Sequence, residues 1–523
     1  MAYKTYIFEM KQDEYWYGPE VNSWVMYPLH RESTYEVDVN HYKGVNQVNP
    51  LLISSKGRAI WCEEGFKLKV AEGKIEVQSY KGEVQLYEFG TTLKEAFKGI
   101  AQKCFAGNGI VPPKDFFVKP QYNTWIELIY NQNQEDILKY ATSIVEQNMP
   151  VGIIMIDDSW SEYYGRWRFN GARFPNPKAM VDRLHELGFE VMLWCCPFIS
   201  PDSLEFRQLR DKGYLVKNTK GEVSLKEWWN GYSGVLDLSH PGAVAWMKEQ
   251  CQYLMDTYGI DGFKFDAGDA MYYSDEDVTY GNVDANKQCE LWAQFGLEYP
   301  YNEYRACYKM AGTHLVQRLA DKSHSWNSNG LSSLIPNQLT QGILGYAYTC
   351  PDMIGGGSYT DFLDGSKNLD QELFVRYAQC AALMPMLQFS AAPWRVLSQE
   401  KFEACKAAAW LHVKYADYIY ALAKEASKSV EPIVRYMSYE FPEEGLELII
   451  DQFMLGNKYL VAPVLEKGAT AREVSFPTGK WLGDDGVVVE GPCRITVDVP
   501  LDSYFPEPAL PDHAWSQITG SYL

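Results

Sequence analysis

The spacing of hydrophobic positions changes twice along the chain. Up to about residue 110, short alternating runs such as TYEVDVN, RAIWCEE and KLKVAEGKIEVQSY predict β-strands, with a hairpin at AEGK. The apolar spacing of the next segment, TTLKEAFKGIAQKCF, predicts a helix. Alternation returns after about residue 425 in QFMLGNKYLVAPVL, REVSFPTGKW and VVVEGPCRITVDVP. We therefore expect small β-domains at both ends of the chain.

Between about residues 118 and 425, apolar runs alternate with amphipathic stretches such as NQEDILKYATSIVEQN. The predicted strands are YNTWIELIY, GIIMIDD, FEVMLWCCPF, SGVLDLSHP, GFKFDAGD, HLVQRLA, LGYAYTCPD and ALMPMLQFS. Strands that alternate with helices form parallel βα units, and eight such units are enough for a (β/α)8 TIM barrel of the α/β class. Most of the charged and aromatic candidates below stand at the carboxyl ends of these runs, where barrel enzymes keep their chemistry.

Composition narrows the classes of partner. The net charge of −20 argues against nucleic acid and against an anionic membrane. No apolar run approaches the roughly 20 residues of a membrane helix, and no secretory leader is visible. The eleven cysteines lack CxxC spacing, and the eight histidines form no HxH or HxxxH pair. We expect no metal, no cofactor and a cytoplasmic location. The sequence is also compatible with a homo-oligomer.

The stretch FKFDAGD places charges at the end of a core strand. Lys264 and Asp266 lie on one side of that strand, because side chains alternate, and Asp269 follows three residues later. A carboxylate beside a cation has a lowered pKa and stays ionised, as the nucleophile of a retaining glycosidase must. The alternative is a purely structural ion pair.

Other strand ends carry candidates for sugar binding. In IMIDDSW, Asp157 and Asp158 point to opposite sides, and we favour Asp157 as a hydroxyl acceptor with Trp160 as a stacking wall. The alternative is that Asp158 caps the next loop and neither acid touches substrate. Further candidates at strand ends or in nearby loops are Trp194, Trp229, Asp352 and Trp394.

An ordered series of motifs runs from about residue 120 to 500: IDDSW, EWWNG with VLDLSHP, FKFDAG, GLSSLIPNQLT, LGYAYTCPDMIGG, MPMLQFSAAPWR, PIVRYM and DQFMLGNKYLVAPVL. This series resembles glycoside hydrolase family 31, the retaining α-glycosidases, and within it the branch of myogenesis-regulating glycosidases. The resemblance implies an N-terminal β-sandwich (residues 1–112), a catalytic barrel (113–425) and one or two C-terminal β-domains (426–523).

The resemblance also implies roles for single residues. The family nucleophile falls on Asp266, and the hydroxyl-binding aspartates fall on Asp157 and Asp352. Arg318 matches a substrate-side arginine. Substrate contacts are further expected from Lys264 and from Trp326, the residue that precedes the general acid/base segment.

At the acid/base position this chain departs from the branch, because Asn329 stands where the branch has an aspartate. An amide cannot donate a proton to a leaving oxygen, and acid/base assistance contributes about 10²–10⁴ in rate. Three interpretations stay open: an inactivated variant, an acid supplied by another residue such as Asp321, Asp361 or Asp364, or a rebuilt loop.

The implied activity is that of a retaining exo-α-glycosidase acting on a small carbohydrate, with an α-galactoside expected first and an α-glucoside or α-xyloside next. A charged sugar stays open because YYGRWRFNGARF contains Arg166, Arg168 and Arg173. Two rival hypotheses also stay open. One is a catalytically inactive carbohydrate-binding homologue, and the second is a different barrel family of α-galactosidases.

Overall fold

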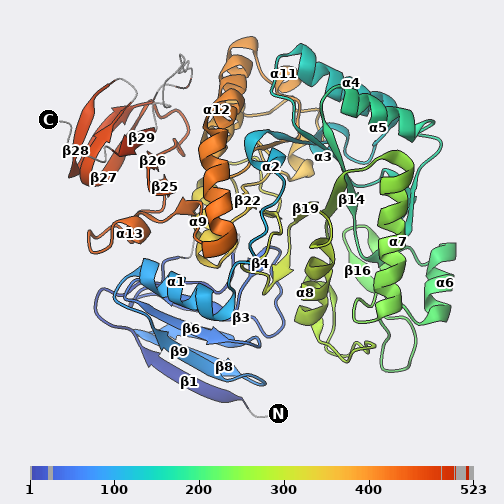
Figure 1. The fold of residues 1–523 in the computed structure, drawn as a ribbon, viewed down its shortest axis with the longest axis horizontal. Coiled ribbons are helices and arrows are strands. Elements are labelled where there is room, and N and C mark those ends of the chain that lie inside the picture. The colour runs from blue at the N-terminus through green and yellow to red at the C-terminus, as the bar shows by residue number, and fades with distance from the viewer. Residues whose placement is uncertain (1–2, 22–26, 484–485, 500, 502–513, 518–523) are drawn as a thin grey trace.

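The computed structural model describes residues 3–21, 27–483, 486–499, 501 and 514–517. It has three parts (Figure 1): N-terminal antiparallel sheets, a central barrel, and a C-terminal sheet beside the long helix α12 (Gln399–Ser429).

Eight parallel strands form the barrel in the order β22-β21-β19-β18-β14-β11-β10-β23. Their bounds are β10 Gln121–Asn123, β11 Ile153–Ile156, β14 Glu190–Cys195, β18 Gly262–Phe265, β19 Tyr301–Tyr304, β21 Gln317–Arg318, β22 Thr349–Cys350 and β23 Gln388–Phe389. A parallel bridge between Met353 and Gln388 joins the two outer strands. The predicted (β/α)8 barrel is confirmed.

Helices surround these strands. The longer ones are α4 Gln134–Glu146, α5 Pro177–Glu186, α7 Pro241–Tyr258, α8 Ala285–Gly296, α9 Leu334–Ile343, α10 Gln371–Ala381 and α12. The short ones are α2 Asp115–Val118, α3 Trp125–Leu128, α6 Leu204–Lys212 and α11 Pro393–Val396, whereas α13 Met437–Glu440 belongs to the C-terminal part. The sequence sets their ends: Pro241 opens α7 at its first turn, and Gly259 ends it in the left-handed region at φ +80°.

Two barrel strands differ from expectation. SGVLDL forms β17 (Gly231–Val235), which pairs antiparallel with β15 (Phe198–Ile199) and β16 (Lys226–Trp228) outside the barrel. The barrel strand that takes its place is β19, whose sequence is YNEY. Hydrophobic patterning misses β19 because Asn302 and Glu303 are both buried polar residues. Glu303 stands beside Lys264 in the barrel interior, and Asn302, on the other face, bonds to backbone groups of Tyr299 and Val316.

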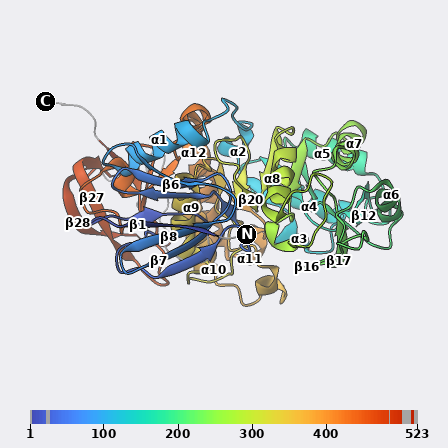
Figure 2. The ribbon, with the colours of Figure 1, turned by 90° about the horizontal axis from the view of Figure 1, so that it is seen from below.

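The N-terminal part contains two four-stranded antiparallel sheets, β1-β8-β7-β3 and β2-β5-β6-β9. The bounds are β1 Lys4–Glu9, β2 Trp16–Tyr17, β3 Tyr35–Asp38, β5 Leu51–Ser54, β6 Arg58–Cys62, β7 Lys67–Ala71, β8 Lys74–Ser79 and β9 Val84–Glu88. Helix α1 (Leu93–Cys104) follows, with a capping box between Thr92 and Glu95. Seen from below, the sheets lie on the side of the barrel away from α5 and α7 (Figure 2).

The C-terminal sheet has six strands in the order β24-β25-β26-β29-β27-β28. Their bounds are β24 Val434–Arg435, β25 Phe453–Leu455, β26 Tyr459–Val461, β27 Ala471–Leu482, β28 Val488–Asp498 and β29 Ala514–Gln517. Part of this sheet has its own small core, which includes Phe476 and Trp481. Among the residues that the structure describes, no helix combines the length and apolar character needed to cross a bilayer.

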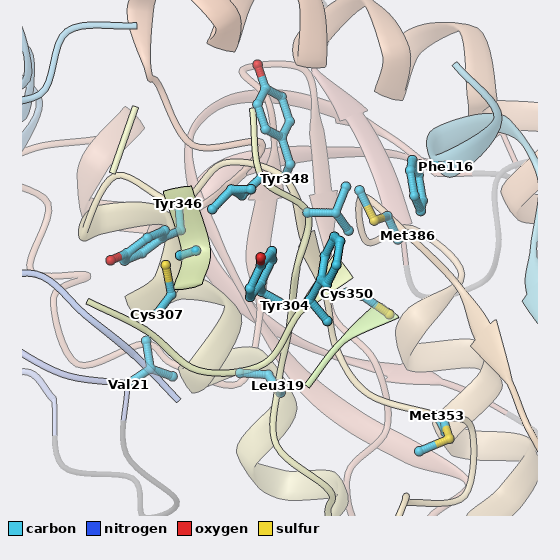
Figure 3. Close-up of a cluster of buried hydrophobic side chains, with 14 of the residues drawn as sticks. Val21, Phe116, Tyr304, Cys307, Leu319, Tyr346, Tyr348, Cys350, Met353 and Met386 are labelled. Carbon is cyan, nitrogen blue, oxygen red and sulfur yellow. The ribbon is translucent and has the colours of Figure 1, made fainter. Parts of the chain in front are cut away.

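One hydrophobic core joins the N-terminal part to the barrel. Figure 3 shows Val21 in the same cluster as Cys307, Leu319 and Tyr346. Strand β4 (Gln47–Val48) pairs with β20 (Cys307–Tyr308), in the segment between β19 and β21 where an ideal barrel has a helix. The two parts therefore share one buried interior.

Gln47 ties the N-terminal part to the ends of two barrel strands. Its amide nitrogen donates to the backbone carbonyls of Arg305 (2.5 Å) and Arg318 (2.9 Å). Its carbonyl oxygen accepts a hydrogen bond from Gln341 at 2.8 Å. The side chain is fully buried, so these bonds have no water to replace them.

We expect Gln47→Ala to lower the free energy of unfolding by about 1–3 kcal/mol, because the buried backbone carbonyls of Arg305 and Arg318 lose their hydrogen-bond donor. Thermal unfolding of the variant and of the unaltered protein measures the effect. The control is Gln12→Ala, which removes an exposed glutamine bonded only to Asp13. Equal melting temperatures for the two variants would contradict the anchoring role of Gln47.

Candidate active site

A cavity of about 430 Å³ opens at the carboxyl ends of the barrel strands, a volume typical of a small-molecule site. Of the residues predicted from sequence, the following line it: Asp157, Trp194, Trp229, Lys264, Asp266, Arg318 and Asn329. Residues far apart in the chain therefore meet at one end of the barrel, as the strand-end pattern predicted.

Asp266 follows β18 directly and is held from three sides. Its Oδ1 accepts hydrogen bonds from the Ala267 amide (2.8 Å) and from Arg305 Nε (3.2 Å). Its Oδ2 accepts one from Trp194 Nε1 at 3.0 Å. Burial raises the pKa of this carboxyl group, but the charges of Arg305 and Lys264 outweigh burial and lower the pKa well below its usual range. Asp266 is therefore a fixed, ionised carboxylate in the cavity wall.

Arg305 is the main cationic partner of Asp266, and sequence reasoning missed it because it follows the unpredicted strand β19. Its two terminal nitrogens bind the carboxylate of Asp269 at 2.7 and 2.8 Å, and Nη1 also donates to the Val45 carbonyl. The Trp229 ring lies 5.8 Å from the guanidinium carbon. Arg305 thus joins two aspartates, the N-terminal part and an aromatic wall.

Lys264 has a different partner from the one expected. Its Nζ donates to Asp157 Oδ2 at 2.6 Å, and both side chains are almost fully buried. Lys264 stands level with Trp194 and Glu303 on the neighbouring strands, inside the barrel. The predicted Lys264–Asp266 pair is therefore corrected: Lys264 bonds Asp157 and lowers the pKa of Asp266 through its charge alone.

Asp157 and Asp158 both line the cavity, so the expectation that only one of them can face it is wrong. Strand β11 ends at Ile156, and Ser159 turns the chain at φ +74°, which frees both side chains from strand alternation. Asp158 accepts hydrogen bonds from Tyr164 Oη and Asn230 Nδ2. Burial, and then the nearby charge of Asp157, raise the pKa of Asp158 to about 7.

Asp352 is fully buried and is not among the residues that line the cavity, so its contact with a sugar hydroxyl stays a prediction. It accepts hydrogen bonds from Arg318 Nη1 (2.6 Å) and from the backbone amides of Lys322 and Gly357. A Cβ on Gly356 would meet the Lys322 carbonyl at 2.5 Å. The acid and the glycine run therefore hold the loop that positions Arg318.

Three of the predicted tryptophans lie outside the lining of the cavity. Trp160 is fully buried, and its Nε1 donates to the Trp194 carbonyl, because the turn at Ser159 directs the ring into the packing layer. Trp326 donates to Asp370, and Trp394 packs on Tyr140. Stacking of these rings on substrate is thus not supported by the geometry.

Asn329 lines the cavity, and its amide donates to Ser323 Oγ at 2.9 Å. Of the three acids considered in its place, Asp321 also lines the cavity and accepts a hydrogen bond from Arg318 Nη1 at 2.9 Å. Asp361 and Asp364 are not lining residues; they accept hydrogen bonds from the His324 amide and from Asn368.

The three arginines considered for recognition of a charged sugar are not among the residues that line the cavity. Arg166 pairs with Glu162 and Glu205, Arg168 stacks on Tyr253, and Arg173 donates to backbone carbonyls.

The described residues contain one group with metal-ligand spacing, formed by His185, Glu190 and Asp261. Glu190 begins β14 and Asp261 directly precedes β18, so this group lies at the amino ends of the strands, away from the cavity.

An ionised aspartate after the fourth barrel strand, held in the wall of a cavity, is what a barrel glycosidase requires of its nucleophile. Residues 120–422 match the model of the glycosyl hydrolases family 31 TIM-barrel domain, and residues 430–507 match the family 31 C-terminal domain. The chain belongs to glycoside hydrolase family 31, and the resemblance seen in the sequence is confirmed.

The similar proteins include the myogenesis-regulating glycosidase of Mus musculus, 32% identical over 79% of this chain and 59% of that protein. The alpha-xylosidase XylQ of Lactiplantibacillus pentosus is 25% identical over 85% of this chain and 60% of XylQ. This chain thus spans about 60% of the length of these relatives. The structure of a Flavobacterium johnsoniae dextranase with glucose has the same fold (TM-score 0.84, 22% identity, 98% of this chain and 66% of that chain).

We expect Arg305→Gln to destabilise the protein by about 3–5 kcal/mol at neutral pH, because two buried carboxylates lose their cation. Without the cation, their folded-state pKa values rise above the unfolded value of about 3.9. A carboxyl group with a raised folded-state pKa destabilises the fold above the unfolded pKa, and the penalty shrinks as the pH falls. The loss in melting temperature should therefore be larger at about pH 7 than at about pH 5.

The matched control is Arg173→Gln, since Arg173 donates to the backbone carbonyls of Tyr130 and Ser159. Its effect on melting temperature should not change between these two pH values. Identical pH dependence in both variants would contradict the clamp role of Arg305.

Proposed function

We propose that this chain is a retaining, exo-acting α-glycosidase whose nucleophile is Asp266. The observation that carries the proposal is the environment of this carboxylate, which is ionised, oriented by Arg305 and Trp194, and part of the cavity wall. Such a group can attack an anomeric carbon and form a glycosyl ester. Lys264 and Asp157 form a buried ion pair, and both residues line the cavity, so they offer a terminal sugar a fixed polar contact.

The sugar bound next to Asp266 is neutral under this proposal. The cationic residues among the lining residues are Lys264, Arg305 and Arg318, and each of them is paired with a carboxylate. An anionic substituent on the sugar would need a cation that is not already neutralised. Hydroxyl groups, in contrast, can use the free lone pairs of Asp157.

An α-galactoside is the preferred substrate, on the basis of the likeness to the myogenesis-regulating glycosidase branch. An α-glucoside or an α-xyloside is the alternative. The similarity to XylQ, which is named an alpha-xylosidase, supports the α-xyloside. Galactose and glucose differ only in the orientation of the C4 hydroxyl. The side chains that reach this hydroxyl therefore determine which of the two sugars the site prefers. Asp157 and Trp194 are our candidates, since both line the cavity.

A binding protein without catalysis is the second candidate function, and Asn329 in the cavity wall is the observation in its favour. A site that only binds sugar has no need for an ionised carboxylate clamped by two donors, so we prefer the enzyme. We further propose a cytoplasmic location, because the structure contains eleven free cysteines, as a reducing compartment would maintain.

We expect the chain to hydrolyse nitrophenyl α-galactoside faster than the corresponding α-glucoside, α-xyloside and α-N-acetylgalactosaminide. Asp266→Asn should lower kcat by about 10³-fold or more, since it removes the nucleophile. The control is Asp256→Asn, the same change at an exposed aspartate of α7, which should keep full activity. Sugar binding without turnover by the unaltered chain would favour the binding protein instead.

A further inference from the structure

A retaining mechanism needs a second carboxyl group besides the nucleophile. That group gives a proton to the leaving oxygen and later accepts one from water. The Asn329 amide cannot perform either transfer, because it has no acidic proton in the required range and its nitrogen donates to Ser323. The proton must therefore come from another group in the cavity.

Four carboxyl groups line the cavity among the described residues: Asp157, Asp158, Asp266 and Asp321. Three of them form ion pairs. Asp157 binds Lys264, Asp266 binds Arg305, and Asp321 binds Arg318, with nitrogen–oxygen distances of 2.6, 3.2 and 2.9 Å. Each of these three carboxyl groups would have to leave its ion pair before it could hold a proton for the leaving oxygen.

Asp158 is the exception. Its carboxyl oxygens accept hydrogen bonds from Tyr164 Oη at 3.0 and 3.1 Å and from Asn230 Nδ2 at 2.8 Å. Both partners are neutral. We propose that Asp158 is the general acid/base of this enzyme, in place of the residue at position 329. This inference rests on the proposed function of a retaining glycosidase.

The surroundings of Asp158 suit both proton transfers. The titratable groups that face it are Asp157, Tyr164, Tyr130 and Cys196. None of them carries a positive charge. Burial, followed by Asp157, raises the pKa of Asp158 to about 7, which is near the value at which one group can act as acid and then as base.

Asp158 and Asp266 stand on either side of Trp194. Strand β14 lies between β11 and β18, so two strand spacings, about 9.6 Å, separate the backbones of the two acids. Retaining enzymes hold their two carboxyl groups roughly 5–5.5 Å apart, so the assignment requires the two side chains to converge from this backbone separation. Trp194 Nε1 binds Asp266, and the Trp194 ring lies 6.0 Å from the ring of Tyr164, which binds Asp158.

Two partly exposed aromatic residues of the cavity lining stand next to Asn230, which binds Asp158. Asn230 belongs to the hairpin of β16 and β17 and follows Trp229, a lining residue that is 46% exposed. Tyr130, also lining and 41% exposed, donates to Asn230 Oδ1 at 3.4 Å. These aromatic rings form a rim on which the departing group can rest, next to the proposed donor.

The reaction has two steps, formation and hydrolysis of the glycosyl-enzyme, and Asp158 transfers one proton in each. In the first, an oxygen of Asp266 bonds to the anomeric carbon, the bond to the leaving oxygen breaks, and that oxygen keeps the electron pair and takes the proton of Asp158. In the second, water attacks the anomeric carbon while Asp158 accepts its proton. The ester bond breaks, and its electron pair returns to the Asp266 carboxylate.

The test compares leaving groups in Asp158→Asn and in the unaltered chain. An acidic phenol departs without a proton, whereas a sugar or alkyl alcohol does not. We expect kcat/KM for a dinitrophenyl glycoside to stay within about tenfold, while kcat/KM for an alkyl glycoside falls by about 10²–10⁴-fold. Sodium azide should restore release of the glycosyl-enzyme and give an α-glycosyl azide. Glu162→Gln, on a neighbouring hairpin and outside the cavity lining, should match the unaltered chain for both substrates.

Two results would overturn the assignment. A loss of the same size for every leaving group would make Asp158 a sugar-binding residue, and no loss would remove it from the reaction. NMR of the first-formed product separates this failure from that of the proposed function. Retention at the anomeric carbon leaves the function in place, whereas inversion, or no turnover of any substrate, overturns both.

Tyr164→Phe gives an independent readout. Tyr164 donates to Asp158 and lowers its pKa, so removal of the hydroxyl should move the alkaline limb of the kcat/KM profile to higher pH. A profile that does not move would contradict the proton-donor role, because a structural tyrosine would change the rate without changing the titration.

Discussion

The ion pair between Arg305 and Asp266 is the interaction on which the site depends. Burying these charges costs free energy that only close pairing can offset, and Arg305 achieves this by binding Asp269 as well. The same guanidinium binds the Val45 carbonyl and lies against Trp229. Strand β18, strand β19, the N-terminal part and the aromatic wall are therefore fixed relative to one carboxylate.

The N-terminal part belongs to this site. Val45 lines the cavity, Asn46 accepts a hydrogen bond from the Ala320 amide, and Gln47 binds the carbonyls of both active-site arginines. This contact occupies the place where the barrel lacks a helix between β19 and β21. The segment of residues 45–47 therefore links the stability of the N-terminal sheets to the position of Arg305 and Arg318.

Local patterns in the sequence were enough to predict the barrel and most of its strands, because apolar runs and amphipathic helices have distinct periods. The same patterns placed Asp266 and Asp157 at strand ends, because they show where each apolar run stops. They failed at β19, where a charged interior replaces hydrophobic residues, and so missed Arg305. The partner of Lys264 and the burial of Trp160 depend on contacts between distant segments, which spacing along one strand cannot reveal.

The proposed reaction depends on a covalent bond between Asp266 and the sugar. The most direct measurement of that bond is mass spectrometry of peptides after incubation with a 5-fluoro-α-glycosyl fluoride, a donor whose fluoride leaves without a proton. We expect one added glycosyl group on the peptide that contains Asp266 and none in Asp266→Asn. Turnover without any labelled peptide, or a label on another acid, would contradict the assignment of Asp266 as the nucleophile.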